Sequence, residues 1–278
     1  MARQPIDYQK FIHPSDRKAL AALQKIPVLD VVYKKIMDWG YEKFMYNMNL
    51  ASMVKLGPNQ MPKIYDMLLE TCDKIGIDVP ELYLQAGPAN AYTFGDTRPQ
   101  IVLYSGAVAI LEEDELKAVI AHECGHILCR HSLYGSMTRM LMQMGLSVFS
   151  LSGPAIYSMY YALLYWNRCS EYSADRVAAY VMDDADIIGR QLMKMVGGFV
   201  WNRGELNYNE FLRQADALED LEEQSFINKG INIWLEKDLD HPFPALRAKE
   251  VKEWYDQSCF ELPPPANGDD AKQDLSWK

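Results

Sequence analysis

The residues with the clearest capacity for chemistry are His122, Glu123 and His126, in the stretch HECGH. Helical residues four positions apart project from one face, one turn apart, so the two imidazoles can bind a single ion. Zinc is bound by such histidine pairs, and the glutamate after the first histidine reaches a water molecule beside the metal. The stretch predicts two metal ligands, His122 and His126, and a general base, Glu123. A core helix whose histidines are only hydrogen-bonded is the alternative.

The surrounding residues predict that this motif lies on a buried helix. Acidic residues from Glu112 to Glu115 stand where a helix N-terminus favours negative charge. Apolar residues follow at helical spacing up to Leu128. Cys124 would point away from the two histidines, so we do not count it as a ligand.

A third ligand is expected downstream, because hydrolytic zinc sites use three protein ligands and leave a position for water. Glu171 and Asp175 lie four residues apart in SEYSAD, on one helix face. Glu171 can enter the coordination shell, while Asp175 can accept the second ring N–H of a ligand histidine and so fix its tautomer. Carboxylates at this spacing are commonly just solvated. Here they stand in a segment rich in Ala, Val and Tyr, which favours a role in the site.

The elements around these residues predict an α+β fold that is mainly α-helical. Helices are expected from Met1 to about Met61, including one continuous helix from Val28 to Asn49, and again from Met61 to Ile75. Three short strands are expected at 81–84, 90–95 and 100–105.

The small sheet predicted from these strands stands directly before the motif helix. An exposed edge strand could hold an extended peptide through backbone hydrogen bonds. A purely structural sheet is the alternative, and the pattern does not identify the edge strand.

An apolar stretch from Met140 to Asn167 contains no Asp, Glu, Lys or Arg. A membrane-spanning helix needs about 20 apolar residues, but Ser150, Ser152, Gly153 and Pro154 interrupt this stretch near its middle. A hairpin that enters a membrane, a helix pair lying on one, and an apolar lid over the site are three interpretations. We favour the lid or helical hairpin and keep peripheral membrane contact open.

Composition limits the class of partner and the compartment. The 278 residues carry a net charge of −10, which argues against a nucleic-acid partner because phosphate binding needs clustered Lys and Arg. The five cysteines form no CxxC pair and are expected to be reduced thiols of a cytoplasmic protein. The first residues show no secretory signal.

Four motifs occur in one order: NAYTFG at 90–95, HECGH at 122–126, SEYSAD at 170–175 and HPFPALR at 241–247. Together they resemble the HtpX-type zinc metallopeptidases, a gluzincin group that includes the type I CAAX prenyl proteases. The resemblance covers about residues 61–256. It implies a zincin-like metalloprotease domain at 61–258, behind an N-terminal helical layer at 1–60 and before a Pro/Asp-rich tail at 259–278.

The resemblance implies a zinc endopeptidase that acts on protein or peptide substrates. One Zn²⁺ would be held by His122, His126 and Glu171, with Glu123 as catalytic base and Asp175 as the partner that orients a ligand. His241 and Arg247 would stabilise the tetrahedral intermediate and brace the site. The substrate-aligning strand would include Asn90, Ala91 and Tyr92.

One departure from the family pattern matters. HtpX proteins begin with transmembrane helices, whereas this chain begins with polar, charged residues. If the motif helix continues, His131 lies off the face that carries the two ligands, so we expect a supporting or structural role for it. We expect His13 to be a surface residue.

The rival to a working protease is a chaperone-like or autoinhibited zinc protein, with a closed lid or with His241 in the open zinc position.

Overall fold

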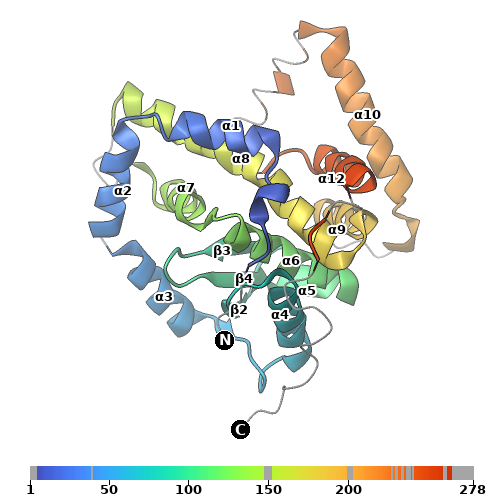
Figure 1. The fold of residues 1–278 in the computed structure, drawn as a ribbon, viewed down its shortest axis with the longest axis horizontal. Helices are drawn as coiled ribbons and strands as arrows, with labels where there is room; N and C mark the ends of the chain where they lie inside the picture. Colours follow the sequence, from blue (N-terminus) through green and yellow to red (C-terminus); the bar gives the residue numbers. More distant parts are fainter. Residues whose placement is uncertain are drawn as a thin grey trace.

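The computed structural model describes residues 5–38, 40–146, 152–198, 203–226, 228, 231–232, 235, 239, 241–258 and 262–264. Within these residues the chain is mainly α-helical, with one four-stranded sheet, and the predicted α+β class is confirmed. Figure 1 shows the sheet near the middle of the molecule, with α2 and α3 on one side and α9, α10 and α12 on the other. The helices are α1 (Pro14–Leu23), α2 (Val28–Asp38), α3 (Tyr41–Ser52), α4 (Pro62–Ile75), α5 (Ser105–Ile110), α6 (Glu113–Leu128), α7 (Ser132–Met144), α8 (Pro154–Met182), α9 (Ala185–Gly197), α10 (Tyr208–Gln224) and α12 (Pro244–Ser258).

The sheet contains the three expected strands, β2 (Glu81–Gln85), β3 (Ala91–Phe94) and β4 (Gln100–Tyr104), and a two-residue strand, β1 (Val54–Lys55), that was not expected. The strand order is β1-β2-β4-β3. β2 runs parallel to β4, whereas β3 and β1 run antiparallel to their neighbours. β3 is therefore an edge strand.

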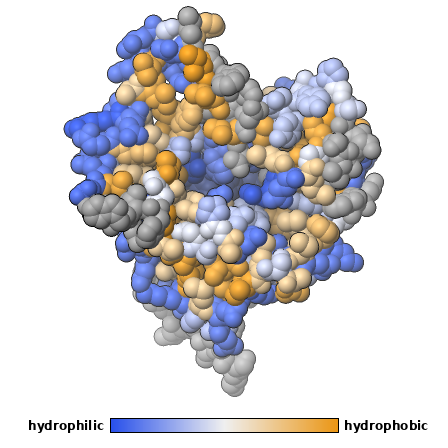
Figure 2. Space-filling model, turned by 180° about the vertical axis from the view of Figure 1, so that it is seen from behind, coloured by the Kyte–Doolittle hydropathy of each residue, from blue (hydrophilic) through white to orange (hydrophobic). Residues whose placement is uncertain are grey.

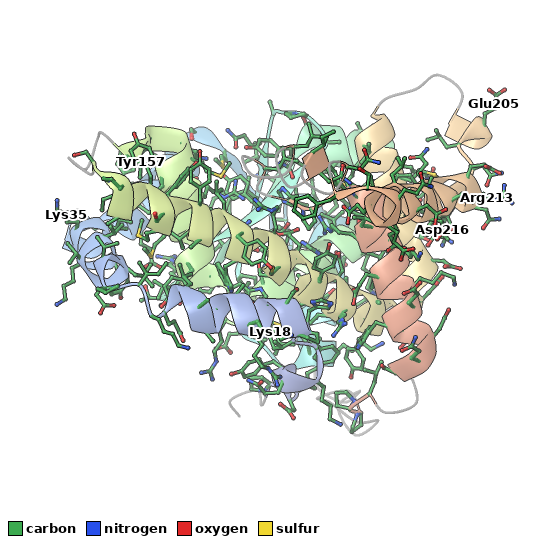
Figure 3. All side chains as sticks on the ribbon, turned by 90° about the horizontal axis from the view of Figure 1, so that it is seen from above. Lys18, Lys35, Tyr157, Glu205, Arg213 and Asp216 are labelled. Atoms are coloured by element: carbon green, nitrogen blue, oxygen red, sulfur yellow. The ribbon has the colours of Figure 1, made fainter. Side chains whose placement is uncertain are left out.

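The sheet separates two hydrophobic clusters, because successive strand side chains point to opposite faces. Leu82 and Ile101 lie in a cluster with residues of α4, α6 and α9. Tyr83 and Val102 lie in the other cluster, with residues of α1, α2, α7 and the first half of α8. The N-terminal helices thus pack on the second face of the sheet, and α1 runs alongside α8 (Figures 1 and 3).

Two expectations about the helices and their residues, the helix over 28–49 and the exposure of His13, are wrong. The helix expected from Val28 to Asn49 is broken at Gly40, whose φ of 72° lies in the left-handed region that glycine tolerates. The second half of the apolar stretch and the segment carrying Glu171 belong to one helix of 29 residues, α8. His13 is half-buried, with its Nε2 3.3 Å from a Glu250 oxygen.

The apolar stretch from Met140 to Asn167 is interrupted between α7 and α8, where Pro154 occupies the first turn of α8. Residues 147–151 lie outside the described ones. In the described part of the chain, no helix combines the length and the apolar character that a membrane crossing requires.

The four cysteines in the described part of the chain, Cys72, Cys124, Cys129 and Cys169, are buried and form no disulfide. Cys259 and most of the expected tail at 259–278 lie outside the described residues.

The start of α6 is fixed by Glu115, which is only 3% exposed. Its Oε2 accepts hydrogen bonds from the Glu112 backbone amide at 2.9 Å and from Lys194 Nζ, on α9, at 2.8 Å. One carboxylate therefore satisfies a free amide of the first turn and anchors α6 to α9.

We predict that Glu115→Ala lowers the free energy of unfolding by about 2–3 kcal/mol, because it removes the cap and leaves Lys194 without its closest partner. Urea unfolding measures the change. The control is Glu113→Ala in the same turn, whose pair with Lys63 is exposed on both sides and whose loss is expected to cost less than about 1 kcal/mol. Equal losses in the two variants would contradict the assignment.

Candidate metal centre and active site

α6 brings the two motif histidines together inside the protein. His122 and His126 face each other with 3.2 Å between their Nε2 atoms. Both rings come from the same side of α6, as the four-residue spacing predicts. His122 is 8% exposed.

Glu171 reaches this pair from α8. Its Oε2 lies 3.3 Å from His122 Nε2, and its Oε1 lies 3.2 Å from His126 Nε2. The two helices approach closely at Gly125, where an added Cβ would lie 3.1 Å from the Cα and O atoms of Ala174. The glycine inside HECGH therefore allows the backbone contact that delivers Glu171 to the histidines.

The three residues fit a divalent cation, and zinc in particular. Two atoms held about 2.0–2.1 Å from one tetrahedral ion are roughly 3.3 Å apart, which matches the observed separations of 3.2–3.3 Å. Glu171 Oε2 is buried and forms no well-aligned hydrogen bond with a described residue, although Arg247 Nη1 lies 3.0 Å away. Two imidazoles and one carboxylate are a set of donors that zinc accepts.

The electrostatics of the three residues favour positive charge between them. Burial lowers the pKa of His122, but the adjacent carboxylates of Asp175 and Glu171 outweigh burial and raise it to about 10. Burial raises the pKa of Glu171, but electrostatic attraction to His241 and Arg247, with contacts from the two motif histidines, holds it well below its usual range. The place between these side chains thus attracts a cation, either a proton or a metal ion.

Asp175 lies one turn after Glu171 and contacts the other side of His122, with Oδ1 2.9 Å from Nδ1. Arg247, on α12, donates to both Asp175 oxygens, from Nε at 2.8 Å and Nη2 at 2.7 Å. Burial raises the pKa of Asp175, but the charge and hydrogen bonds of Arg247 outweigh it and lower the pKa. Arg247 thereby joins Asp175 and Glu171 in one buried ionic group.

Glu123 points to a cleft beside these residues and is 5% exposed. Thr93 Oγ1, on β3, lies 2.8 Å from Glu123 Oε2 and 3.0 Å from its backbone oxygen. We did not expect Thr93 from the sequence, because nothing in the spacing of NAYTFG links it to the motif helix.

The cleft has an empty volume of about 450 Å³, and residues of β3, α6, α7 and α8 line it together with His241. The side chain of His241 is 34% exposed, and its Nε2 lies 3.6 Å from Glu171 Oε2. In Figure 2 the face opposite to that of Figure 1 is hollowed near its middle, with hydrophilic residues gathered in the hollow.

The three residues expected to bind substrate stand at and just before the start of β3, and two of them lie on one side of the cleft. Ala91 and Tyr92 line the cleft and are largely buried. Arg139 of α7 lies over the Tyr92 ring, 4.0 Å from its centre. Asn90 precedes the strand, and its Oδ1 accepts a hydrogen bond from the Ala91 amide at 2.9 Å.

A helical α+β fold that holds a buried His-His-Glu group in an open cleft is the setting of a metalloprotease, and comparison with known proteins agrees. The model of Peptidase family M48 matches residues 58–255. The chain therefore belongs to this peptidase family, and the resemblance to HtpX-type metallopeptidases is confirmed.

Three relatives illustrate the similarity. The chain is 31% identical over 252 residues to "Plastoglobule-localized metallopeptidase 48, chloroplastic" of Arabidopsis thaliana, a match that covers 90% of this chain and 73% of the relative. It is 31% identical over 170 residues to a "Protease HtpX homolog" of Helicobacter acinonychis (strain Sheeba), covering 50% of this chain and 54% of the relative. It is 37% identical over 78 residues to a "Protease HtpX homolog" of Trichormus variabilis, covering 27% of each. No solved structure matches the chain significantly.

We predict that Arg247→Leu lowers the free energy of unfolding of the metal-free protein by about 3–5 kcal/mol, because Asp175 and Glu171 stay buried without their main cationic partner. Urea unfolding in the presence of a chelator measures the loss. The control is Arg213→Leu, whose pair with Glu210 on α10 is solvent-exposed and contributes less than about 1 kcal/mol. A loss for Arg247→Leu as small as that of the control would mean that the buried ionic group does not stabilise the fold.

Proposed function

We propose that this chain is a zinc-dependent endopeptidase that cleaves extended or unfolded protein segments. His122, His126 and Glu171 are its metal ligands, and Glu123 is its general base. The observation that supports this best is the convergence of three ligand atoms, 3.2–3.3 Å apart, beside a buried glutamate in an open cleft.

A bound zinc ion supplies Lewis acidity, which polarises the scissile carbonyl and makes a water molecule more acidic. Glu123 accepts the proton of the attacking water and delivers it to the leaving amine. The Thr93 hydroxyl donates to Glu123 and fixes the direction in which its carboxylate points. Asp175 holds the Nδ1 proton of His122, so that Nε2 is free to bind the metal.

His241 and Arg247 have different roles in this proposal. His241 is partly exposed in the cleft, where it can donate to the oxygen that becomes negative in the tetrahedral intermediate. Arg247 is buried against two carboxylates, so it braces the ligands from behind and does not contact substrate.

The substrate lies along β3 in this proposal. In the described part of the chain, β3 pairs on one side only, with β4. An extended peptide can add to the other side through backbone hydrogen bonds, which provide affinity with little dependence on its side chains. Asn90, Ala91 and Tyr92 then align the peptide beside Glu123.

We predict that Glu123→Gln retains zinc but abolishes cleavage of casein and of a quenched peptide, because the amide cannot accept the proton from water. His126→Ala is expected to lose both zinc and activity, because it removes a ligand. Elemental analysis and a chelator-sensitive peptidase assay measure the two properties. The control Glu113→Gln, at the exposed start of the same helix, should keep both, and normal cleavage by Glu123→Gln would refute its role as the base.

A latent state is the second candidate, supported by the position of His241 on the open side of the three ligands, 3.6 Å from Glu171. A small movement would bring its Nε2 into the position that a water molecule needs, giving an autoinhibited or chaperone-like zinc protein. Full zinc content without turnover on any unfolded protein would favour this state over the working protease.

We also propose peripheral membrane contact through the first half of α8. Tyr157, Tyr161 and Tyr165 are spaced by four residues and about half exposed, and Figure 3 shows Tyr157 near one end of the helix. Tyrosines of this kind sit at the boundary between lipid and water.

We predict that the protein floats with phosphatidylcholine vesicles and that replacing the three tyrosines by serine reduces the bound fraction. The control is Phe226→Ser, an aromatic residue that is 89% exposed elsewhere on the surface and should leave flotation unchanged. Equal flotation of the triple variant and the unaltered protein would exclude this stripe as the contact.

A further inference from the structure

His131 lies against a metal ligand although it stands beyond the motif helix. α6 ends at Leu128, and Arg130 adopts a left-handed conformation with φ of 62°. This turn folds the chain back, so that the His131 amide donates to the His126 carbonyl at 2.9 Å. The His131 ring, in a residue that is 3% exposed, then places its Nδ1 3.0 Å from His126 Nδ1.

Asp16 lies on the far side of His131 and comes from α1. Its Oδ2 is 3.0 Å from His131 Nε2. Oδ2 also accepts a hydrogen bond from Ser173 Oγ at 2.6 Å, and Oδ1 accepts one from Trp166 Nε1 at 3.0 Å; both donors are on α8. The residue is 1% exposed. Burial raises its pKa, but the hydrogen bonds from His131, Ser173 and Trp166 outweigh burial and lower the pKa, so the side chain is a carboxylate at neutral pH.

The contact between the two Nδ1 atoms requires one proton, since two lone pairs or two N–H groups would repel at 3.0 Å. His126 presents Nε2 to His122 and Glu171, so as a neutral metal ligand it carries its proton on Nδ1. His131 must then accept at Nδ1 and carry its own proton on Nε2, which is the atom that faces the Asp16 carboxylate. Each group in the series thus determines the tautomer of the next.

We propose that Asp16 and His131 are positioning residues that hold His126 in the tautomer and orientation required for metal binding, so that α1 completes the metal site. This inference rests on the proposed function, because it concerns the support of a zinc ligand. It gives each histidine ligand its own carboxylate: Asp175 supports His122 directly, and Asp16 supports His126 through His131. The matched family region covers residues 58–255, so His131 lies within it and Asp16 lies outside it.

The alternative is that Asp16 only anchors α1 to α8 through Ser173 and Trp166. Zinc affinity distinguishes the two roles, because an anchor affects stability without changing the donor strength of His126. We predict that Asp16→Asn and His131→Leu raise the zinc dissociation constant by about 10–100-fold, the usual effect of removing a partner that orients a ligand. The control Ser173→Ala removes one hydrogen bond to Asp16 but leaves His131 in place, and should bind zinc as the unaltered protein does.

The measurement is chelator competition on metal-free full-length protein refilled with zinc, with the visible absorption of the Co²⁺-loaded protein as a second readout of ligand strength. If the unaltered protein binds zinc and the Asp16 and His131 variants match it in zinc affinity and Co²⁺ spectrum, this inference is overturned. The proposed function is then left intact. Unaltered protein that binds no zinc would overturn both.

A second pair of variants at His131 tests the inference even if Asp16→Asn does not fold. His131→Asn keeps an oxygen near the position of Nδ1 that can accept from His126, whereas His131→Leu has no acceptor. The two variants are compared at matched unfolding midpoints. Weaker zinc binding by His131→Leu than by His131→Asn supports the inference. Equal zinc affinity of these two variants contradicts it.

Discussion

Two carboxylates buried on one face of α8 constrain the rest of this structure. Glu171 and Asp175 are 3% and 0% exposed, and buried charges are tolerated only when cations and hydrogen-bond donors surround them. Arg247 from α12 and His122 from α6 meet both carboxylates. The packing of α6 and α12 against α8 is therefore tied to charge compensation as well as to apolar burial, and a metal ion in the proposed site would complete that compensation.

The pairing of His122 with His126, and of Glu171 with Asp175, could be predicted from the sequence because each pair of residues lies on one helix. Four-residue spacing places His122 and His126 on one face, and likewise Glu171 and Asp175, whatever the rest of the fold does. How the two helices meet could not be predicted. It depends on the glycine at 125, which lets the α8 backbone approach, and the spacing of the motif alone does not show this.

The residues that were missed or misread depend on tertiary structure. His131 was placed off the ligand face by extending the helix, but α6 ends at Leu128 and the left-handed turn at Arg130 returns the ring to His126. Asp16 and Thr93 come from a helix and a strand whose docking has no local pattern. Pro154 correctly indicated an interruption, but the pattern did not show that the helix beginning there runs on through Glu171.

α8 joins two regions that the apolar pattern treated as separate. Its first half carries the exposed tyrosines, and its second half carries Glu171 and Asp175. With about 1.5 Å of rise per residue, a rigid helix of this length links an outer surface of the protein to the site. The start of α7 and the middle of α8 also line the cleft, and of the described residues in the apolar stretch only Asn167 does so.

The groups around the site are drawn from almost the whole length of the chain, from Asp16 near one end to Arg247 near the other. Contacts between such distant positions form late in folding, because the intervening loops must close first. During synthesis, α12 is made after α6 and α8, so Arg247 is the last of these charged groups to be added to the chain. It follows that the two buried carboxylates obtain their arginine partner only after translation has passed α12, and the buried group can assemble only from a nearly complete set of helices.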